Sequence, residues 1–207
     1  MDNIQEIQLE IAGPIALWTR LDSGSCPRSY PAPTFSAVKG IFESIRNWQH
    51  LVVVRPIRAE ICAPVQYHRY TTNYGGPLRK TSQIRKGDSF QLHSEVLINV
   101  IYRLYAAIDF IPNASGPIWG SFAASEYRNA FNRGLEIGRY HHMPFLGWKE
   151  FVPSYVGPFR ESTAVCDTEN HLIPAMLHSV FDQLHNGNPD PVIRHNVMIK
   201  KGVLNYV

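Results

Sequence analysis

The chain has 207 residues, of which 44% are hydrophobic and 18% charged, with a formal net charge of +3. This balance is typical of a globular protein with one sizeable domain or two small ones. It argues against a transmembrane helix, because no segment approaches the roughly 18 uninterrupted apolar residues that a span requires. Three isolated cysteines, none in a C-x-x-C pair, predict neither a disulfide framework nor a thiolate zinc site.

The N-terminal residues MDNIQEIQLE lack the basic start and apolar core of a secretory signal, so we expect a cytoplasmic protein without membrane partners. Its charge is unevenly distributed. Residues 20–91 carry 11 Lys or Arg against 4 Asp or Glu, whereas the remainder carries 9 against 13. The local excess indicates a surface that binds a polyanion, although a solvated charged face without a partner has the same composition.

A strand is predicted at the start of the chain. Apolar and polar residues alternate from Ile7 to Ile11 until Gly13-Pro14 interrupts the pattern, and the strand resumes over 15–19. A loop rich in Ser, Gly and Pro follows over 20–33.

The next segment predicts a helix. Thr34 follows the two prolines of YPAPT and can cap a helix with its hydroxyl. Apolar residues then recur at steps of three and four as far as Trp48, which leaves Lys39 and Arg46 on the polar face. The pattern fits an ordinary amphipathic surface helix as well as a helix that binds phosphates.

Strands are expected next over 51–57 and 58–65. Between Gln66 and Phe90 the periodicity vanishes, and basic residues are interleaved with aromatic ones. This segment is either a long loop or a hairpin that projects from the body. Cations can bind phosphates while rings stack on bases, so its composition favours a single-stranded nucleic acid.

The second half begins with the best strand candidate, over 96–110, in which Arg103 is expected at an exposed or edge position. A Pro/Gly linker over 112–120 and a helix that ends at Gly138 follow. Further strands are expected near Val156, over 175–181 and over 192–203. The inferred architecture is α+β, with a sheet of about five strands and two helices on one face.

The sequence lacks the H-E-x-x-H, phosphate-loop, G-x-G-x-x-G and G-x-S-x-G signatures. His141 and His142 are adjacent and have no Asp or Glu at ligand spacing, so we expect no metal site and no cofactor. His142 is retained as a candidate functional residue because it lies close to a helix end and a proline. The alternative is a loop histidine bonded to backbone.

Two segments resemble a known family. YPAPTFSAVKGIFESI is similar to the early signature of the CRISPR-associated fifth-family proteins, which are RAMP-superfamily subunits of the Cascade surveillance complex. GRYHHMPFLGWKEF resembles the G-x-x-x-H-x-P-x-L-G-C-R-E-F block of their type I-C branch, with Trp148 and Lys149 in place of Cys and Arg. VLINVIYRLYAAIDF and PVIRHNVMIKKGVL follow in the expected order, so the resemblance covers nearly the whole chain.

This resemblance implies a ferredoxin-like (RRM/RAMP) core over 1–140, with a basic β-hairpin thumb at about 66–92, and a small β-rich C-terminal portion over 141–207. It also implies a Cascade subunit in antiviral defence that binds the 5′ handle of the CRISPR guide RNA. Such a subunit caps the complex beside the backbone and large subunits and meets target DNA only through the complex. The residues expected to bind RNA are Arg28, Tyr30, Lys39, Arg46, His68, Arg69, Arg79, Lys80, Arg85 and Lys86.

The alternative function that the resemblance implies is metal-independent cleavage of precursor CRISPR RNA. A base takes the proton of a 2′-hydroxyl, and a cation stabilises the attacked phosphate. Arg46 stands where the family has an aromatic residue or His, and Glu126-Tyr127 replace a Lys-His pair. The candidate bases are therefore Tyr127, His142 and His68, and the candidate cations are Arg46 and Lys39. A scaffold with only incidental RNA contact is a third alternative.

Overall fold

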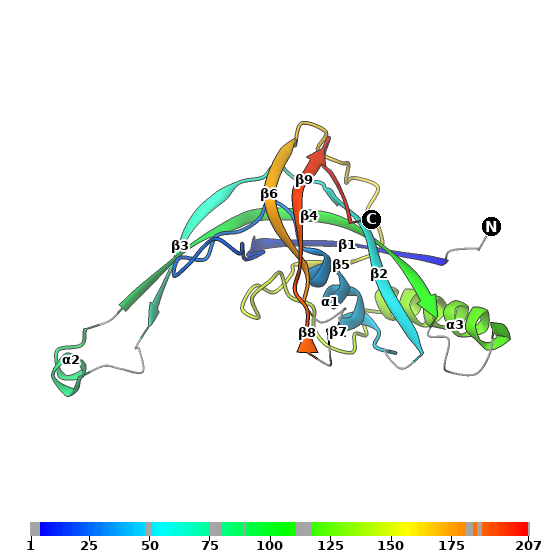
Figure 1. Cartoon of the computed structure of the whole chain (residues 1–207), viewed down its shortest axis with the longest axis horizontal. Coiled ribbons are helices and arrows are strands. Elements are labelled where there is room, and N and C mark those ends of the chain that lie inside the picture. Colours follow the sequence, from blue (N-terminus) through cyan, green and yellow to red (C-terminus); the bar gives the residue numbers. More distant parts are fainter. Residues whose placement is uncertain are drawn as a thin grey trace.

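The computed structural model describes residues 5–48, 51–74, 80–88, 90–110, 117–180, 184–185 and 188–206. Figure 1 shows a curved sheet with the helices α1 and α3 beneath it and a long hairpin that extends to one side, with the short helix α2 at its end.

Six elements form the core: β1 (Gln5–Ala16), α1 (Phe35–Ile45), β2 (Val52–Ile61), β4 (Phe90–Phe110), α3 (Pro117–Glu136) and β5 (Tyr155–Gly157). The four strands lie in the order β5-β1-β4-β2, and each neighbouring pair is antiparallel. A β-α-β-β-α-β chain with this strand order is the ferredoxin-like arrangement. The predicted α+β, ferredoxin-like fold is therefore confirmed.

Helix α1 forms where the sequence predicts it. The Thr34 hydroxyl accepts a hydrogen bond from the Ala37 amide at 3.2 Å, which satisfies one of the free N–H groups of the first turn. The apolar stripe of α1 is buried, and its Phe42 ring lies 5.6 Å from the Phe131 ring of α3. The two helices thus pack together against the sheet.

Several predicted boundaries are wrong. The separate strands expected over 51–57 and 58–65 form the single strand β2, which continues through Pro56. Strand β1 continues through Gly13-Pro14, because Gly13 pairs with Val100 and Ile15 pairs with Ile98 of β4. Helix α3 begins at Pro117, inside the linker predicted over 112–120, since a proline suits the first position of a helix. The predicted stop is confirmed, because Gly138 follows the helix with a φ of 67°.

The segment from Gln66 to Phe90 forms a hairpin rather than a long loop. Strand β3 (Tyr67–Tyr74) pairs with the first part of β4, from Tyr67 opposite Leu97 to Tyr74 opposite Phe90. Helix α2 (Thr81–Arg85) lies between the two strands at the far end. Because β4 has 21 residues, the same strand forms one side of the hairpin and the centre of the sheet.

Among the described residues, three C-terminal strands and the hairpin strand β3 enlarge the sheet from four strands to eight, more than the five or so expected. The C-terminal strands are β6 (His171–Ser179), β9 (Val192–Lys200) and β10 (Val203–Asn205), in the order β2-β10-β9-β6, with a small pair β7 (Leu184–His185) and β8 (Asn188–Pro189) beside them. One sheet therefore includes strands from both sides of residue 140. The division of the chain at that residue stays a prediction.

A buried carboxylate anchors the segment between β5 and β6. Glu10 is fully buried and accepts hydrogen bonds from the Arg160 amide at 3.1 Å and the Thr163 hydroxyl at 2.9 Å, and it also pairs with Arg103. Arg103 lies in the central strand with its side chain 18% exposed, so the expected exposed or edge position is wrong. We call residues 158–170 the crossing segment, because these contacts hold it across β1 and β4.

Candidate functional site

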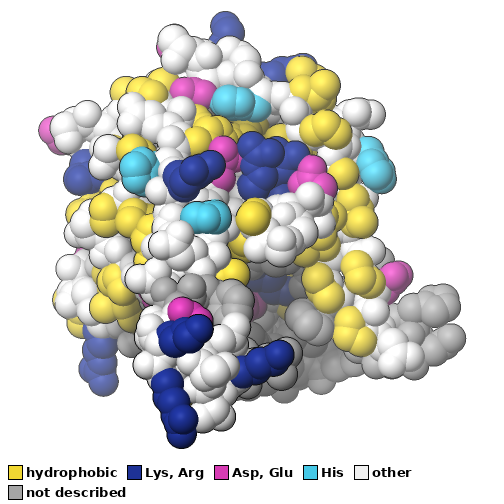
Figure 2. Space-filling view, turned by 90° about the vertical axis from the view of Figure 1, so that its left-hand side faces the viewer, with side chains coloured by type: hydrophobic (Ala, Val, Ile, Leu, Met, Phe, Trp, Pro, Cys, Tyr) yellow, Lys and Arg dark blue, Asp and Glu magenta, His cyan; other side chains and the backbone are white. Residues whose placement is uncertain are grey.

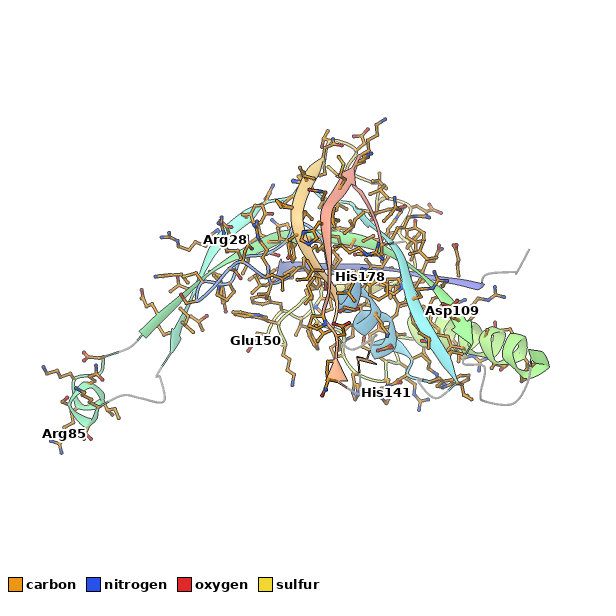
Figure 3. The ribbon with its side chains drawn as sticks, viewed as in Figure 1. Arg28, Arg85, Asp109, His141, Glu150 and His178 are labelled. Carbon is orange, nitrogen blue, oxygen red and sulfur yellow. The ribbon has the colours of Figure 1, made fainter. Side chains whose placement is uncertain are left out.

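The predicted site residues lie in several parts of the molecule. In Figure 3, Arg85 lies at the end of the hairpin, Arg28 lies at its base, and His141, the neighbour of His142, lies near α1. We call residues 80–88 the hairpin tip. We call the loop of residues 141–152 the wall, because it forms one side of a groove along α1.

The hairpin tip presents cations to solvent. Lys80, Arg85 and Lys86 are exposed, and none of the residues of α2 is buried. The helix is held by local bonds, among them the one from the Lys80 amide to the Gln83 side chain at 3.0 Å. Figure 2 looks at the molecule from the hairpin end and shows Lys and Arg side chains standing out from the projecting part. Arg79 lies outside the described residues.

The base of the hairpin carries cations that face a carboxylate. The Arg28 Nε atom lies 2.8 Å from a Glu95 carboxylate oxygen, and Arg69 stands directly opposite Glu95 in the β3–β4 pairing. Because adjacent strand residues point to opposite faces, His68 and Arg69 do not share a surface. Both members of the Arg28–Glu95 pair are more than one third exposed, so the pair is weak and can exchange for a phosphate.

Tyr30 is not available to a bound RNA, and its assignment as an RNA contact is wrong. The side chain is 1% exposed. Its hydroxyl donates a hydrogen bond to the Ala175 carbonyl at 2.9 Å, which ties the loop before α1 to β6.

Tyr127 is likewise a core residue, so its assignment as a catalytic base is wrong. It is fully buried, and its hydroxyl donates a hydrogen bond to the Arg46 carbonyl at 2.7 Å. Burial, and next the Glu43 carboxylate, raise the pKa of the phenol well above its usual value. A base must be deprotonated and must reach its substrate, and Tyr127 meets neither condition.

The end of α1 presents a cation close to this core. Arg46 is the C-cap of the helix and is half-buried, and its guanidinium carbon lies 5.5 Å from the centre of the Trp48 ring. Its Nε atom is buried without a hydrogen-bond partner among the described residues. An anion at this end of α1 would therefore meet an unsatisfied donor. Lys39, on the same helix, is partly exposed.

A groove of about 680 Å³ lies between α1 and the wall. It is lined by Gly40, Glu43, Ser44, Asn47, His142, Met143, Pro144, Phe145, Lys149 and Val152. The wall is joined to the end of α1 by hydrogen bonds from the His142 amide to the Ser44 carbonyl at 2.8 Å and from the His141 amide to the Ile45 carbonyl at 3.2 Å. These bonds satisfy carbonyls that a helix end leaves unpaired, and they fix the backbone of His142.

The far end of the wall is fixed against the sheet and the hairpin base. The Leu17 amide donates to the Leu146 carbonyl at 2.9 Å, and Gly147 has a φ of 96° with no room for a Cβ beside the Leu17 carbonyl. The Trp148 ring stacks on Phe151, whose ring also meets Tyr70 of β3 edge to face. The turn that carries Lys149 is thus held on both sides.

The sequence reasoning did not single out Lys149, which lines the groove with His142. It noted only that lysine replaces arginine in the G-x-x-x-H-x-P-x-L-G-C-R-E-F block. One feature of the sequence could have indicated Lys149. The block has an arginine seven positions after its histidine, and in this chain Lys149 keeps a positive charge at that distance from His142. The structure places both side chains on one groove, whereas Tyr127, another of the predicted bases, lies in the core.

Within the described part of the chain, no group of three or more His, Cys, Asp or Glu could hold a metal ion. Of the helices described there, none combines the length and apolar character needed to cross a membrane.

Known proteins resemble this chain over most of its length. A protein from Thermus thermophilus named CRISPR pre-crRNA endoribonuclease Cas5d is 28% identical over 153 residues, which are 73% of this chain and 63% of that protein. A crystal structure of a CRISPR-associated protein superposes with a TM-score of 0.70 at 17% identity, covering 98% of this chain and 91% of that one. A functionally uncharacterized protein from Streptococcus mutans superposes with a TM-score of 0.68 at 15% identity, covering 98% and 92%.

The two solved structures share the fold of this protein, and the Thermus relative is similar to it in sequence over 153 residues. The family model for CRISPR-associated protein Cas5, of the Cas5d type, matches residues 6–200. This match includes the ferredoxin-like core, the hairpin and most of the C-terminal strands. The chain therefore belongs to the Cas5 family of CRISPR-associated proteins.

Proposed function

We propose that this protein is the Cascade subunit that binds the 5′ handle of the CRISPR guide RNA in the cytoplasm. In this role it caps the complex beside the backbone and large subunits and meets target DNA only through them. Membership of the Cas5 family supports the proposal. The observation that carries it is the hairpin tip, where Lys80, Arg85 and Lys86 project into solvent from a helix without buried residues.

Exposed cations on a projecting hairpin suit the phosphate backbone of a single strand. Each neutralised phosphate releases counterions, so the affinity falls as the salt concentration rises. In the described part of the chain, β3 and β4 join the hairpin tip to the body, so the tip presents its cations to an RNA strand at a distance from the core.

The test is a variant with alanine at Arg79, Lys80, Arg85 and Lys86, measured for affinity to cognate repeat RNA at several salt concentrations. We expect at least about a tenfold loss of affinity, and a salt slope smaller by about 0.7 for each phosphate that is no longer neutralised. The matched control removes four exposed cations elsewhere: Arg128, Arg133, Lys200 and Lys201. An unchanged affinity and slope in the first variant, or an equal loss in the control, contradicts the proposal.

A second candidate function is cleavage of precursor CRISPR RNA. The Thermus relative is named as a pre-crRNA endoribonuclease, and this chain has a histidine and a lysine on one groove. The test is incubation of excess protein with cognate repeat RNA in EDTA. We expect a product that ends in a cyclic phosphate, and RNA that stays intact removes this candidate. If no RNA co-purifies with the protein and its partners, the scaffold alternative is favoured over both.

A further inference from the structure

We propose that RNA cleavage by this protein takes place in the groove between α1 and the wall, with His142 as the general base and Lys149 as the cation. The inference rests on the endoribonuclease activity proposed above and assigns that activity to residues of this chain. It replaces Tyr127 as base and Arg46 or Lys39 as cation.

The first support is that the groove holds its two side chains on a fixed backbone. His142 is tied to the end of α1 through its amide, and the turn carrying Lys149 is held between Trp148 and Phe151. Both side chains are exposed, so they can reach a substrate without displacing core residues. A general base contributes to catalysis only if it is held within hydrogen-bond reach of the proton it removes.

The second support is the chemistry of the lining. Met143, Phe145 and Val152 are 61%, 41% and 51% exposed, which leaves apolar surface on which RNA bases can pack. Ser44 and Asn47 add polar groups on the α1 side. The Glu43 carboxylate faces the same groove and repels phosphate, so the attacked phosphate is expected on the Lys149 side.

In the reaction, a ring nitrogen of neutral His142 takes the proton from the 2′-hydroxyl. The 2′-oxygen forms a bond to the adjacent phosphorus, and the bond from phosphorus to the 5′-oxygen breaks. Lys149 stabilises the negative charge that develops on the phosphate oxygens. The proton held by His142 passes through water to the departing 5′-oxygen, so the products are a 2′,3′-cyclic phosphate and a 5′-hydroxyl, with no metal or further reactant.

The test compares single-turnover cleavage and RNA affinity in the same variants. For His142→Ala we expect a rate loss of about 10²-fold or more, with unchanged RNA affinity. Lys149→Gln is expected to lose rate as well, and Lys149→Arg to recover part of it. Matched controls are His141→Ala and Glu150→Gln, exposed neighbours that do not line the groove, and Tyr127→Phe, which removes only the buried hydroxyl. All three are expected to cleave at nearly the rate of the unmodified protein.

The pH dependence gives a readout that a structural role would not change. A histidine acts as a base only in its neutral form, so cleavage should rise with pH, and this rise should vanish in His142→Ala. The charged groups facing His142 are the His141 ring, with centres 4.2 Å apart, together with Glu43 and Lys149 across the groove. The control His141→Ala is expected to keep the rise.

Three results would overturn the assignment. One is cleavage by His142→Ala at the unmodified rate. Another is a pH profile that survives in that variant. The third is an unmodified protein that binds repeat RNA but leaves it intact, which removes the inference while the proposed handle-binding function stands. An unmodified protein that does not bind repeat RNA contradicts the proposed function itself.

Discussion

The hairpin tip and the wall of the groove differ in what holds their side chains in place. At the tip, the bonds seen among the described residues of the short helix that carries Lys80, Arg85 and Lys86 are local ones. At the wall, His142 and Lys149 stand on a backbone bonded to α1 and to Leu17 and packed against the hairpin base. Long-range attraction of a phosphate chain needs only exposed cations, whereas proton transfer requires a fixed geometry.

The two regions also meet. Tyr70 of β3 packs against Phe151 of the wall, and on the other side of β4 the Arg28–Glu95 pair joins the first loop to the hairpin base. An RNA strand bound along the hairpin would therefore reach the body at the far end of the wall, beside Phe151. Substitutions at Glu10, in the wall and at the hairpin base should show whether the groove and the hairpin depend on different contacts.

The largest loss of stability is expected from Glu10→Gln, which removes the carboxylate that holds the crossing segment on the sheet. Burial alone would raise the pKa of Glu10, but hydrogen bonds from Arg160 and Thr163 and the charge of Arg160 outweigh it and hold the pKa below its ordinary value of 4.5. Removing one partner of a buried ion pair costs about 3 kcal/mol or more, so denaturant unfolding should show a loss of this size.

The sign of the pH dependence follows from the lowered pKa. The stabilisation from ionised Glu10 is complete above the unfolded pKa, near 4.5, and is lost as the pH falls through the lower pKa of the folded state. The free energy of unfolding of the unmodified protein should therefore decrease as the pH falls below about 4.5, and that of Glu10→Gln should decrease less. Equal acid sensitivity in the two proteins would contradict this account.

A loss of similar size is expected from Gly147→Ala, which loosens the wall directly. The residue has a positive φ, which costs about 1–3 kcal/mol for a residue with a Cβ, and the added Cβ would also overlap the Leu17 carbonyl. The free energy of unfolding should therefore fall by more than the conformational cost, and cleavage should fall as well, while RNA affinity stays unchanged. In the control Gly24→Ala, the residue has a φ of 51° and open space around the added Cβ. This variant should therefore lose only the stability that the positive φ costs, without a steric overlap. Equal losses in the two variants would show that the close contact with Leu17 does not matter.

The smallest effect is expected at the hairpin base, from Glu95→Gln. This change frees Arg28 and removes a negative charge beside Arg69. Because exposed ion pairs are weak, we expect RNA affinity to rise only about twofold to fivefold at low salt, with unchanged cleavage of bound RNA. A lower affinity would mean that Glu95 orients Arg28 rather than competing with the phosphate.

Sequence reasoning predicted much of the fold because local signals were strong. The Thr34 cap, the apolar stripe of α1 and the stop at Gly138 are all set by neighbouring residues, and the structure confirms them. The break at Gly13-Pro14 was wrong because strand pairing outweighed the local preferences of glycine and proline. The linker predicted up to residue 120 was wrong because Pro117 suits the first position of a helix. The enlarged sheet was missed because it depends on pairings between distant strands.

The site was predicted less well for a related reason. Tyr30 and Tyr127 have the residue types that RNA contact or catalysis requires, but composition does not reveal that one is tied to β6 and the other to Arg46 in the core. By itself the sequence determined which residues can carry charge, where the hairpin lies and which family the chain resembles. Only the tertiary structure decided that His142 and Lys149 share a groove, because the backbone bonds and ring contacts that hold the wall join residues far apart in the chain.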